Sequence, residues 1–546
     1  MTSPLDPPRN LTAADFPYPS RRMPLLASRG VVATSTPLAV QAGLGMLLAG
    51  GNAVDAALAA AASLTVVEPT QNGIGSDAFA LVWDGSKLHG LNGSGRAPAA
   101  LTTEVCSGLG LSEMPARGWP AVTVPGTPRA WHDLHQRFGR LPFASLFEPA
   151  VSYAEEGFPL SPQVAAAWAG SQQRYAERNV GPEYAGWFDT FAAAGRGARA
   201  GDVWRLPGHA RSLRSIAESG AESFYRGEIA ERTVAFAART GGYIAAQDLA
   251  DHVSTWDEPI SAGYRGHDVW ELPPNCQGAV ALEALSILEG LDLGPERETV
   301  ESYHRQIEAV KLAFADAYAY LGDPKSMTVP VSSLLDPDYV AALRALIGPE
   351  ARDPGPGEPP PGGTVYIAAA DRDGMMVSYI QSNYSGFGSG IVVPETGVAL
   401  QNRGSGFSLR PGHPNRLGPG KRPFHTLMPG FLTRGGEAVG PFSVMGTSMQ
   451  PQGHLQMIVN QIDYGLNPQA SLDAPRWRWL RGKELNLEPG VPEAIVAGLK
   501  AKGHEINVRE GFFGPAYGRG QIIRRLPSGA YLAGSETRAD GYAAGF

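Results

Sequence analysis

The stretch EPPPGGTVYIAAADRDGMMVSYIQ, residues 358–381, joins a Pro/Gly-rich run directly to residues with the pattern of a buried β-strand. The Pro/Gly-rich segment covers residues 353–363 and has the composition of a flexible linker. Thr364 begins the strand-like run, and a second such run follows at 375–381. A threonine therefore occupies the junction between a linker and a predicted core strand.

A threonine in this place has a chemical use if the Gly363–Thr364 bond breaks. An N-terminal threonine carries its own base, because its α-amine has an ordinary pKa of about 8 and lies near the hydroxyl. Gly362 and Gly363 allow unusual backbone angles before the bond. The β-branched Thr364 has a restricted χ1, which helps direct its hydroxyl at the Gly363 carbonyl. The junction suits self-cleavage, although linkers also meet strands in many proteins without such chemistry.

Composition limits the class of protein. The chain has 546 residues, 43% of them hydrophobic and 18% charged, which fits a soluble protein with a large core. A net charge of −8 without a Lys/Arg cluster argues against nucleic acid or a membrane as partner. Cys106 and Cys276 form no CxxC pair, and the N-terminus lacks the pattern of a secretory signal. We expect a cytoplasmic protein.

The order of predicted elements indicates stacked layers of helices and sheets rather than a doubly wound parallel sheet. An arm of about 27 residues precedes two helices that are separated at Gly50-Gly51 and a hairpin with its turn at Asp84-Gly85. Residues 126–325 are predicted to be mostly helical, and the last third to be rich in strands, including strands at 390–393 and 398–401.

Two short patterns resemble binding motifs without their context. GIGSDA at 73–78 matches G-x-G-x-x-A, but it follows a predicted helix and precedes a strand, so a tight turn explains it better than a dinucleotide site. His132 and His135 are one helical turn apart, with no carboxylate cluster beside them. We therefore expect no metal and no organic cofactor.

Many stretches in order along residues 28–546 resemble the γ-glutamyltransferase family of N-terminal-nucleophile hydrolases. They include GGNAVDAALAAAASLTVVEP, VPGTPRAW, FYRGEIA, GGYIAAQDL, TVYIAAADRDG, GKRPFHTLMPG and VNQIDYGLNPQASLDAPR. The similarity is to the glutathione-hydrolase-like branch, which also contains oxamate amidohydrolase and acylases. The resemblance implies an α+β fold, a four-layer αββα sandwich. It also implies a zymogen that cuts itself into residues 1–363 and 364–546, which stay together as one sandwich domain.

The resemblance assigns catalytic roles residue by residue. Thr364 matches the nucleophile, by ungapped spacing to the residues DRDG at 371–374. Ser382 stands where the family has a second hydroxyl that hydrogen-bonds the nucleophile. Gly446 and Thr447 stand where two glycines offer backbone N–H groups to the oxyanion, a role that needs no particular side chain if the backbone of Thr447 permits it.

The sequence departs from the family around the substrate. The substrate-binding candidates that the resemblance indicates are Arg96, Tyr384, Arg403, His425 and Thr426, with the register of Arg96 shifted by two positions. Gly406 replaces the aspartate that binds the substrate ammonium, and Arg403 replaces a neutral amide. The pocket is thus predicted to have lost an anion and gained a cation. Arg403 either contacts the ligand or pairs with a carboxylate that the sequence does not reveal.

The predicted function is an autoprocessed N-terminal-threonine amide hydrolase that works through an acyl-enzyme on a small-molecule amide, with transfer to an amine acceptor open. A γ-glutamyl amide such as glutathione is the family-level substrate. The alternatives are an amidase for a small carboxylate-bearing amide of the oxamate type, an acylase, and a catalytically silent binding homologue. The cleaved heterodimer could also pair into a dimer of heterodimers.

Overall fold

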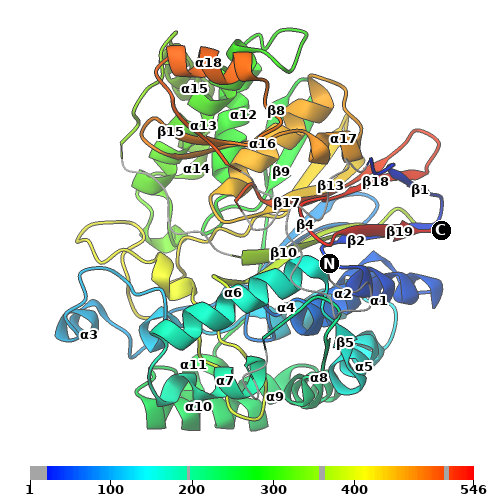
Figure 1. The fold of residues 1–546 in the computed structure, drawn as a ribbon, viewed down its shortest axis with the longest axis vertical. Coiled ribbons are helices and arrows are strands. Elements are labelled where there is room, and N and C mark those ends of the chain that lie inside the picture. The colour runs from blue at the N-terminus through cyan, green and yellow to red at the C-terminus, as the bar shows by residue number, and fades with distance from the viewer. Residues whose placement is uncertain (1–20, 193–196, 356–362, 510–515) are drawn as a thin grey trace, which may run out of the picture.

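Two seven-stranded antiparallel sheets lie against each other in the computed structural model, which describes residues 21–192, 197–355, 363–509 and 516–546 (Figure 1). The first sheet has the order β19-β2-β10-β11-β3-β4-β7. Its strands are β2 (Gly30–Thr34), β3 (Asp77–Trp83), β4 (Leu88–Asn92), β7 (Thr255–Asp257), β10 (Gly363–Asp371), β11 (Met376–Tyr384) and β19 (Tyr542–Gly545).

The second sheet has the order β1-β18-β17-β13-β12-β9-β8. Its strands are β1 (Leu25–Ala27), β8 (Ile260–Tyr264), β9 (His267–Glu271), β12 (Gly430–Arg434), β13 (Glu437–Met445), β17 (Arg519–Arg525) and β18 (Tyr531–Ser535). Two small sheets complete the strands: β5 (Phe158–Pro159) with β6 (Val203–Trp204), and β14 (Trp477–Arg481) with β15 (Glu484–Leu487) and β16 (Glu505–Val508).

Side chains of the junction strand β10 point alternately to the two faces of the first sheet. Helices cover one of these faces, and the second sheet covers the other. Val365 and Ile367 pack into the core shared with the helices, whereas Tyr366 and Ala368 pack into the core between the two sheets. Both faces of β10 are buried, which is why the strand reads as a nearly continuous apolar run.

Helices form the two outer layers (Figure 1). α1 and α2 pack on the first sheet, and α12 and α16 on the second. The helices of the first half of the chain are α1 (Pro37–Leu48), α2 (Ala53–Val67), α3 (Thr103–Gly108), α4 (Thr127–Phe138), α5 (Glu148–Glu156), α6 (Pro162–Arg178), α7 (Ala185–Phe191), α8 (Pro207–Ser219), α9 (Glu222–Tyr225), α10 (Glu228–Thr240) and α11 (Ala246–Ala250).

The remaining helices are α12 (Gly278–Glu289), α13 (Val300–Tyr320), α14 (Val331–Leu334), α15 (Pro337–Ala345), α16 (Met449–Ile462), α17 (Pro468–Asp473) and α18 (Glu493–Ala501). The predicted α+β sandwich of four αββα layers is therefore confirmed. No helix within the described ranges is long and apolar enough to cross a lipid bilayer.

Local sequence signals set several elements. The predicted break between the first two helices is confirmed, because α1 ends at Leu48 and α2 begins at Ala53. Asn52 caps α2 by accepting hydrogen bonds from the N–H groups of Val54 and Asp55, and the Asp55 carboxylate accepts the N–H of Asn52 in return. The hairpin turn at Asp84-Gly85 is also confirmed, between β3 and β4.

The stretch 126–325 is mostly helical, as predicted, but it also contains the unpredicted strands β7, β8 and β9, which join the edges of the two sheets. Other local predictions were wrong or lie outside the description. The strands expected at 390–393 and 398–401 are not formed; the described residues there make isolated bridges, Val392 with Ala399 and Leu400 with Gly75. Most of the N-terminal arm and residues 356–362 of the predicted linker lie outside the described residues.

Candidate active site

The hydroxyls of Thr364 and Ser382 meet at the start of the β10–β11 hairpin. Thr364 is buried and donates from Oγ1 to Ser382 Oγ at 3.1 Å. Ser382 Oγ also accepts the N–H of Tyr384 at 2.7 Å and donates its own proton to the Gly363 carbonyl. One serine hydroxyl thus uses both acceptor positions and its donor, and it links the predicted nucleophile to the carbonyl of the predicted cleavage bond.

Glycine at position 363 was expected for its backbone freedom, but the structure requires it because of limited space. Its φ is not among the positive values that favour glycine. A Cβ on Gly363 would instead lie 1.9 Å from Oε1 of Gln71, closer than any side chain tolerates. The residue before the junction is therefore glycine because another side chain approaches its backbone closely.

Gly446 and Thr447 form the turn between β13, which packs against β10, and α16. Both residues are buried, and their φ values are +136° and +55°. A positive φ is rare for a β-branched residue and often marks a functional turn. Within the described ranges, the N–H groups of Gly446 and Thr447 have no hydrogen-bond acceptor. These two free N–H groups have the character that an oxyanion site requires.

A cavity of about 250 Å³ begins beside the junction strand, because its lining residue Tyr384 lies opposite Gly363 in the β10–β11 ladder. Its wall also contains Gly406, Phe424 and Thr426. The structure therefore brings two of the predicted substrate-binding residues, Tyr384 and Thr426, into one cavity. No aspartate or glutamate is among the described residues that line it.

Arg403 lies directly behind this wall. Its Nη1 donates to Thr426 Oγ1 at 2.7 Å, and its guanidinium carbon lies 4.6 Å from the centre of the Tyr384 ring. The side chain is buried, and its Nε and Nη2 have no hydrogen-bond partner among the residues that the structure describes. Burial lowers the pKa of Arg403 to about 10, so the group is still a cation near neutral pH. Because Thr426 Oγ1 accepts from Arg403, its own proton is free to point into the cavity.

A carboxylate that the sequence analysis did not single out supports this region. Asp77 begins β3 opposite Ser382, and its Oδ1 accepts the N–H groups of Gly95 and Gly126, each at 3.1 Å. Burial raises the pKa of Asp77 to about 7, and the charge of Arg403 opposes that rise. The acidic residue inside the run GIGSDA was the available signal, since a carboxylate is unusual at the start of a fully buried strand.

Both ring nitrogens of His425 bind protein groups rather than a ligand. This corrects its predicted role in substrate binding. Its Nε2–H donates to Asp77 Oδ2 at 3.2 Å, and its Nδ1 accepts the N–H of Leu427 at 3.2 Å. Burial, with Arg403 nearby, holds the pKa of His425 well below its ordinary value, so the ring is neutral. Both ring nitrogens are used, and His425 fixes the turn that carries Thr426.

Arg96 is also placed differently from its prediction. It lines a separate cavity of about 790 Å³, together with Asn92 and Arg422. Its Nη1 donates to the carbonyl of Gly420 at 3.3 Å. The two-position shift in register seen in the sequence therefore corresponds to a side chain outside the wall formed by Tyr384 and Thr426.

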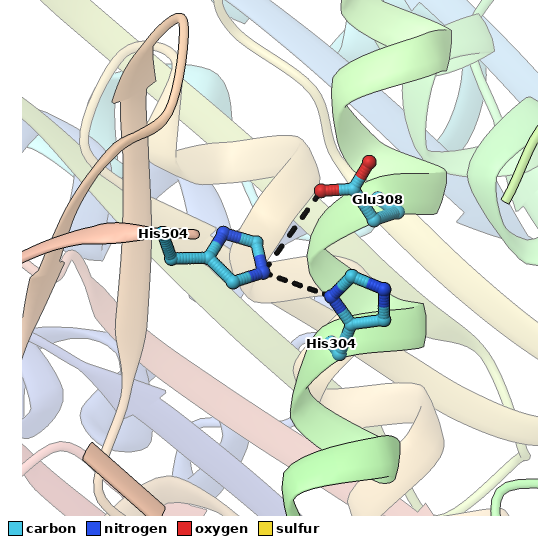
Figure 2. A group of neighbouring side chains, drawn as sticks. All are labelled: His304, Glu308 and His504. Atoms are coloured by element: carbon cyan, nitrogen blue, oxygen red, sulfur yellow. Dashed lines mark hydrogen bonds and ion pairs between the residues drawn. The ribbon is translucent and has the colours of Figure 1, made fainter. Parts of the chain in front are cut away.

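A second buried polar cluster joins His304 and Glu308 of α13 to His504, which lies just before β16 (Figure 2). His304 Nδ1 lies 2.9 Å from His504 Nε2, which lies 4.0 Å from Glu308 Oε1. Lys311 places its ammonium 2.8 Å from Glu308 Oε1 and also donates to the carbonyl of Arg352 at 3.0 Å. The lysine supplies the positive charge that balances this carboxylate. Its bond to Arg352 also holds the residue that precedes the predicted linker against α13.

Ser382→Ala should slow both maturation and turnover, because it removes the hydroxyl that touches Thr364 and Gly363. We expect each rate to fall about 10²-fold, which corresponds to about 2.7 kcal/mol. The rates are measured by intact-mass time courses and by amide hydrolysis. Ser378→Ala is the matched control, since it removes a buried hydroxyl of the same strand whose one partner in the described part of the chain is the Tyr366 hydroxyl. Wild-type rates in Ser382→Ala would remove Ser382 from the site.

Comparisons with known proteins agree with this architecture. The family model described as Gamma-glutamyltranspeptidase matches residues 39–546. The glutathione hydrolase-like YwrD proenzyme of Bacillus subtilis is 37% identical, over 95% of this chain and 99% of that protein. The oxamate amidohydrolase proenzyme of Klebsiella pneumoniae is 35% identical over the same shares. The crystal structure of cephalosporin acylase from Bacillus halodurans aligns with a TM-score of 0.94 and 55% identity, over 97% of this chain and 98% of that one.

Proposed function

The chain belongs to the gamma-glutamyltranspeptidase family, and from that premise we propose that it hydrolyses amides whose acyl group carries a carboxylate but no α-ammonium. The resemblance predicted from the sequence is confirmed by the match over nearly the whole chain. Proteins of this family are made as proenzymes, process themselves into heterodimers and act on small amides. We also propose a role for each residue of the site in maturation and in turnover.

Maturation uses the contacts around Gly363. Thr364 Oγ attacks the Gly363 carbonyl carbon, the C–N bond breaks, and the nitrogen of Thr364 takes up a proton. Water then hydrolyses the resulting ester and leaves a carboxylate on Gly363 and a free amine on Thr364. Ser382 supports both steps, since its hydroxyl already contacts the attacking oxygen and the carbonyl oxygen.

Turnover repeats this chemistry on an external amide. The freed amine of Thr364, with an ordinary pKa of about 8, takes the proton of its own hydroxyl as that oxygen attacks the substrate carbonyl. The N–H groups of Gly446 and Thr447 receive the oxyanion. The amine product leaves, and water or a second amine resolves the acyl-enzyme.

The absence of a carboxylate from the described wall of the cavity carries the proposal for the substrate. A γ-glutamyl group brings an α-ammonium, and an ammonium buried without a partner costs several kcal/mol. A carboxylate meets the free proton of Thr426, whose oxygen is polarised by Arg403. The cavity therefore favours a glutaryl-like or oxamate-like acyl group over a γ-glutamyl one. The names of two similar proteins, an oxamate amidohydrolase and a cephalosporin acylase, support an amide substrate of this wider kind.

The test compares kcat/KM for γ-glutamyl-anilide, glutaryl-anilide, neutral butyryl-anilide and oxamate. We expect glutaryl-anilide or oxamate to exceed γ-glutamyl-anilide by about tenfold or more, because tenfold is only about 1.4 kcal/mol of discrimination. Glutaryl-anilide should also exceed butyryl-anilide, which has no carboxylate. If kcat/KM for γ-glutamyl-anilide is tenfold higher than for the other substrates, the substrate is a γ-glutamyl amide such as glutathione, and the proposed acyl preference is wrong.

A further inference from the structure

Gln277 joins the two turns to which the proposed function assigns substrate recognition and oxyanion binding. It lies just before α12 and is buried. Its Nε2 donates to the carbonyl of Thr426 at 2.6 Å and to the carbonyl of Thr447 at 2.9 Å. Its backbone N–H donates to the carbonyl of His425 at 3.0 Å.

The chemistry of these contacts fixes the orientation of the amide. Both neighbours are carbonyl oxygens, which only accept, so the NH₂ end of Gln277 must face them. The Oε1 atom of Gln277 has no partner among the described residues. A buried amide oxygen without a partner costs free energy. We infer that the benefit of Gln277 comes from its two N–H donors.

The two turns need such a link. Thr447 holds a left-handed backbone at φ +55°. Among the described residues, its carbonyl otherwise accepts just the N–H of Gln450, in the first turn of α16. Thr426 carries the hydroxyl that contacts Arg403 and lines the cavity. The two hydrogens of one planar amide leave in fixed directions, so Gln277 sets the distance between the two turns.

We propose that Gln277 is a positioning residue that holds the oxyanion turn and the substrate-binding wall in register, an inference that rests on the proposed function. Among the described residues it makes no hydrogen bond to Thr364 or Gly363, and the Gly363 carbonyl accepts from Ser382. Gln277 should therefore matter for the external substrate and not for maturation. A displacement of about 1 Å between catalytic groups can cost about 10²-fold in rate.

The experiment compares Gln277→Met and Gln277→Glu, which remove the two donors at similar length, with Gln456→Met. Gln456 is a matched control because it is buried and donates to the carbonyls of Gln452 and Trp477, but it touches neither turn. Each protein is followed by intact mass for processing, by thermal unfolding, and by kcat and KM on whichever of the anilides and oxamate the wild type cleaves fastest.

We expect both Gln277 variants to process completely while kcat falls about 10-fold to 10²-fold and KM rises for a carboxylate-bearing substrate. Gln456→Met should lose thermal stability and keep its kcat. Wild-type kcat in Gln277→Met would overturn the inference, and so would joint loss of processing and turnover, which indicates a merely structural role. A failure of the proposed acyl preference can be distinguished from a failure of this inference, because it would be seen when the wild type is tested on the different substrates.

Discussion

Thr364→Ala is expected to remain one uncut chain, whereas the wild type separates on a denaturing gel into residues 1–363 and 364–546. The variant lacks the oxygen that we propose attacks the Gly363 carbonyl, and among the described hydroxyls Ser382 Oγ is the one that hydrogen-bonds that carbonyl. The two wild-type segments should stay associated under native conditions, because β10 pairs with β2 from the first segment and β11 pairs with β3. The loss of processing should be complete.

Intact-mass spectrometry measures this result, with Thr364→Ser as the control that keeps the hydroxyl and loses the methyl. Thr364→Ser should still be cleaved, more slowly, because serine has a freer χ1 than a β-branched residue. Cleavage of Thr364→Ala at the same bond would assign the nucleophile elsewhere. A wild type that stays uncut after long incubation would instead support a silent binding homologue.

Arg403→Met should remove most of the proposed advantage of a carboxylate-bearing substrate. The buried guanidinium is the positive charge behind the wall of Tyr384 and Thr426. Truncating a buried, hydrogen-bonded charge costs several kcal/mol, so kcat/KM for glutaryl-anilide should fall about 10²-fold to 10³-fold. Hydrolysis of butyryl-anilide should change little, because that acyl group has no charge to stabilise.

Arg538→Met is the matched control for this experiment, since Arg538 is a buried arginine whose partners are Glu488 and Glu536. It should lose stability and keep the ratio between the two anilides. If Arg403→Met keeps the wild-type ratio, the guanidinium acts as a structural partner of Asp77 rather than in substrate selection. Complete processing of Arg403→Met, checked by intact mass, separates this result from misfolding.

The elements that were predicted correctly depend on neighbours in sequence. The cap at Asn52 and the hairpin at Asp84-Gly85 are made by residues within a few positions of one another. The elements that were missed depend on distant partners. β7 pairs with β4, and β9 pairs with β12, so the sheet edges rather than local pattern make 255–271 extended.

The same distinction holds for the site. The sequence determined the junction at Thr364, and the family resemblance indicated Ser382 as its partner. The two residues are 18 positions apart in one hairpin, and the structure places their hydroxyls in contact. Only the tertiary structure decided that His425 hydrogen-bonds Asp77, 348 positions away. It also decided that Arg96 lines another cavity and that Gln277 joins two turns. Local spacing fixes which face of a strand a side chain takes, whereas the packing of two sheets decides which distant polar groups satisfy one another.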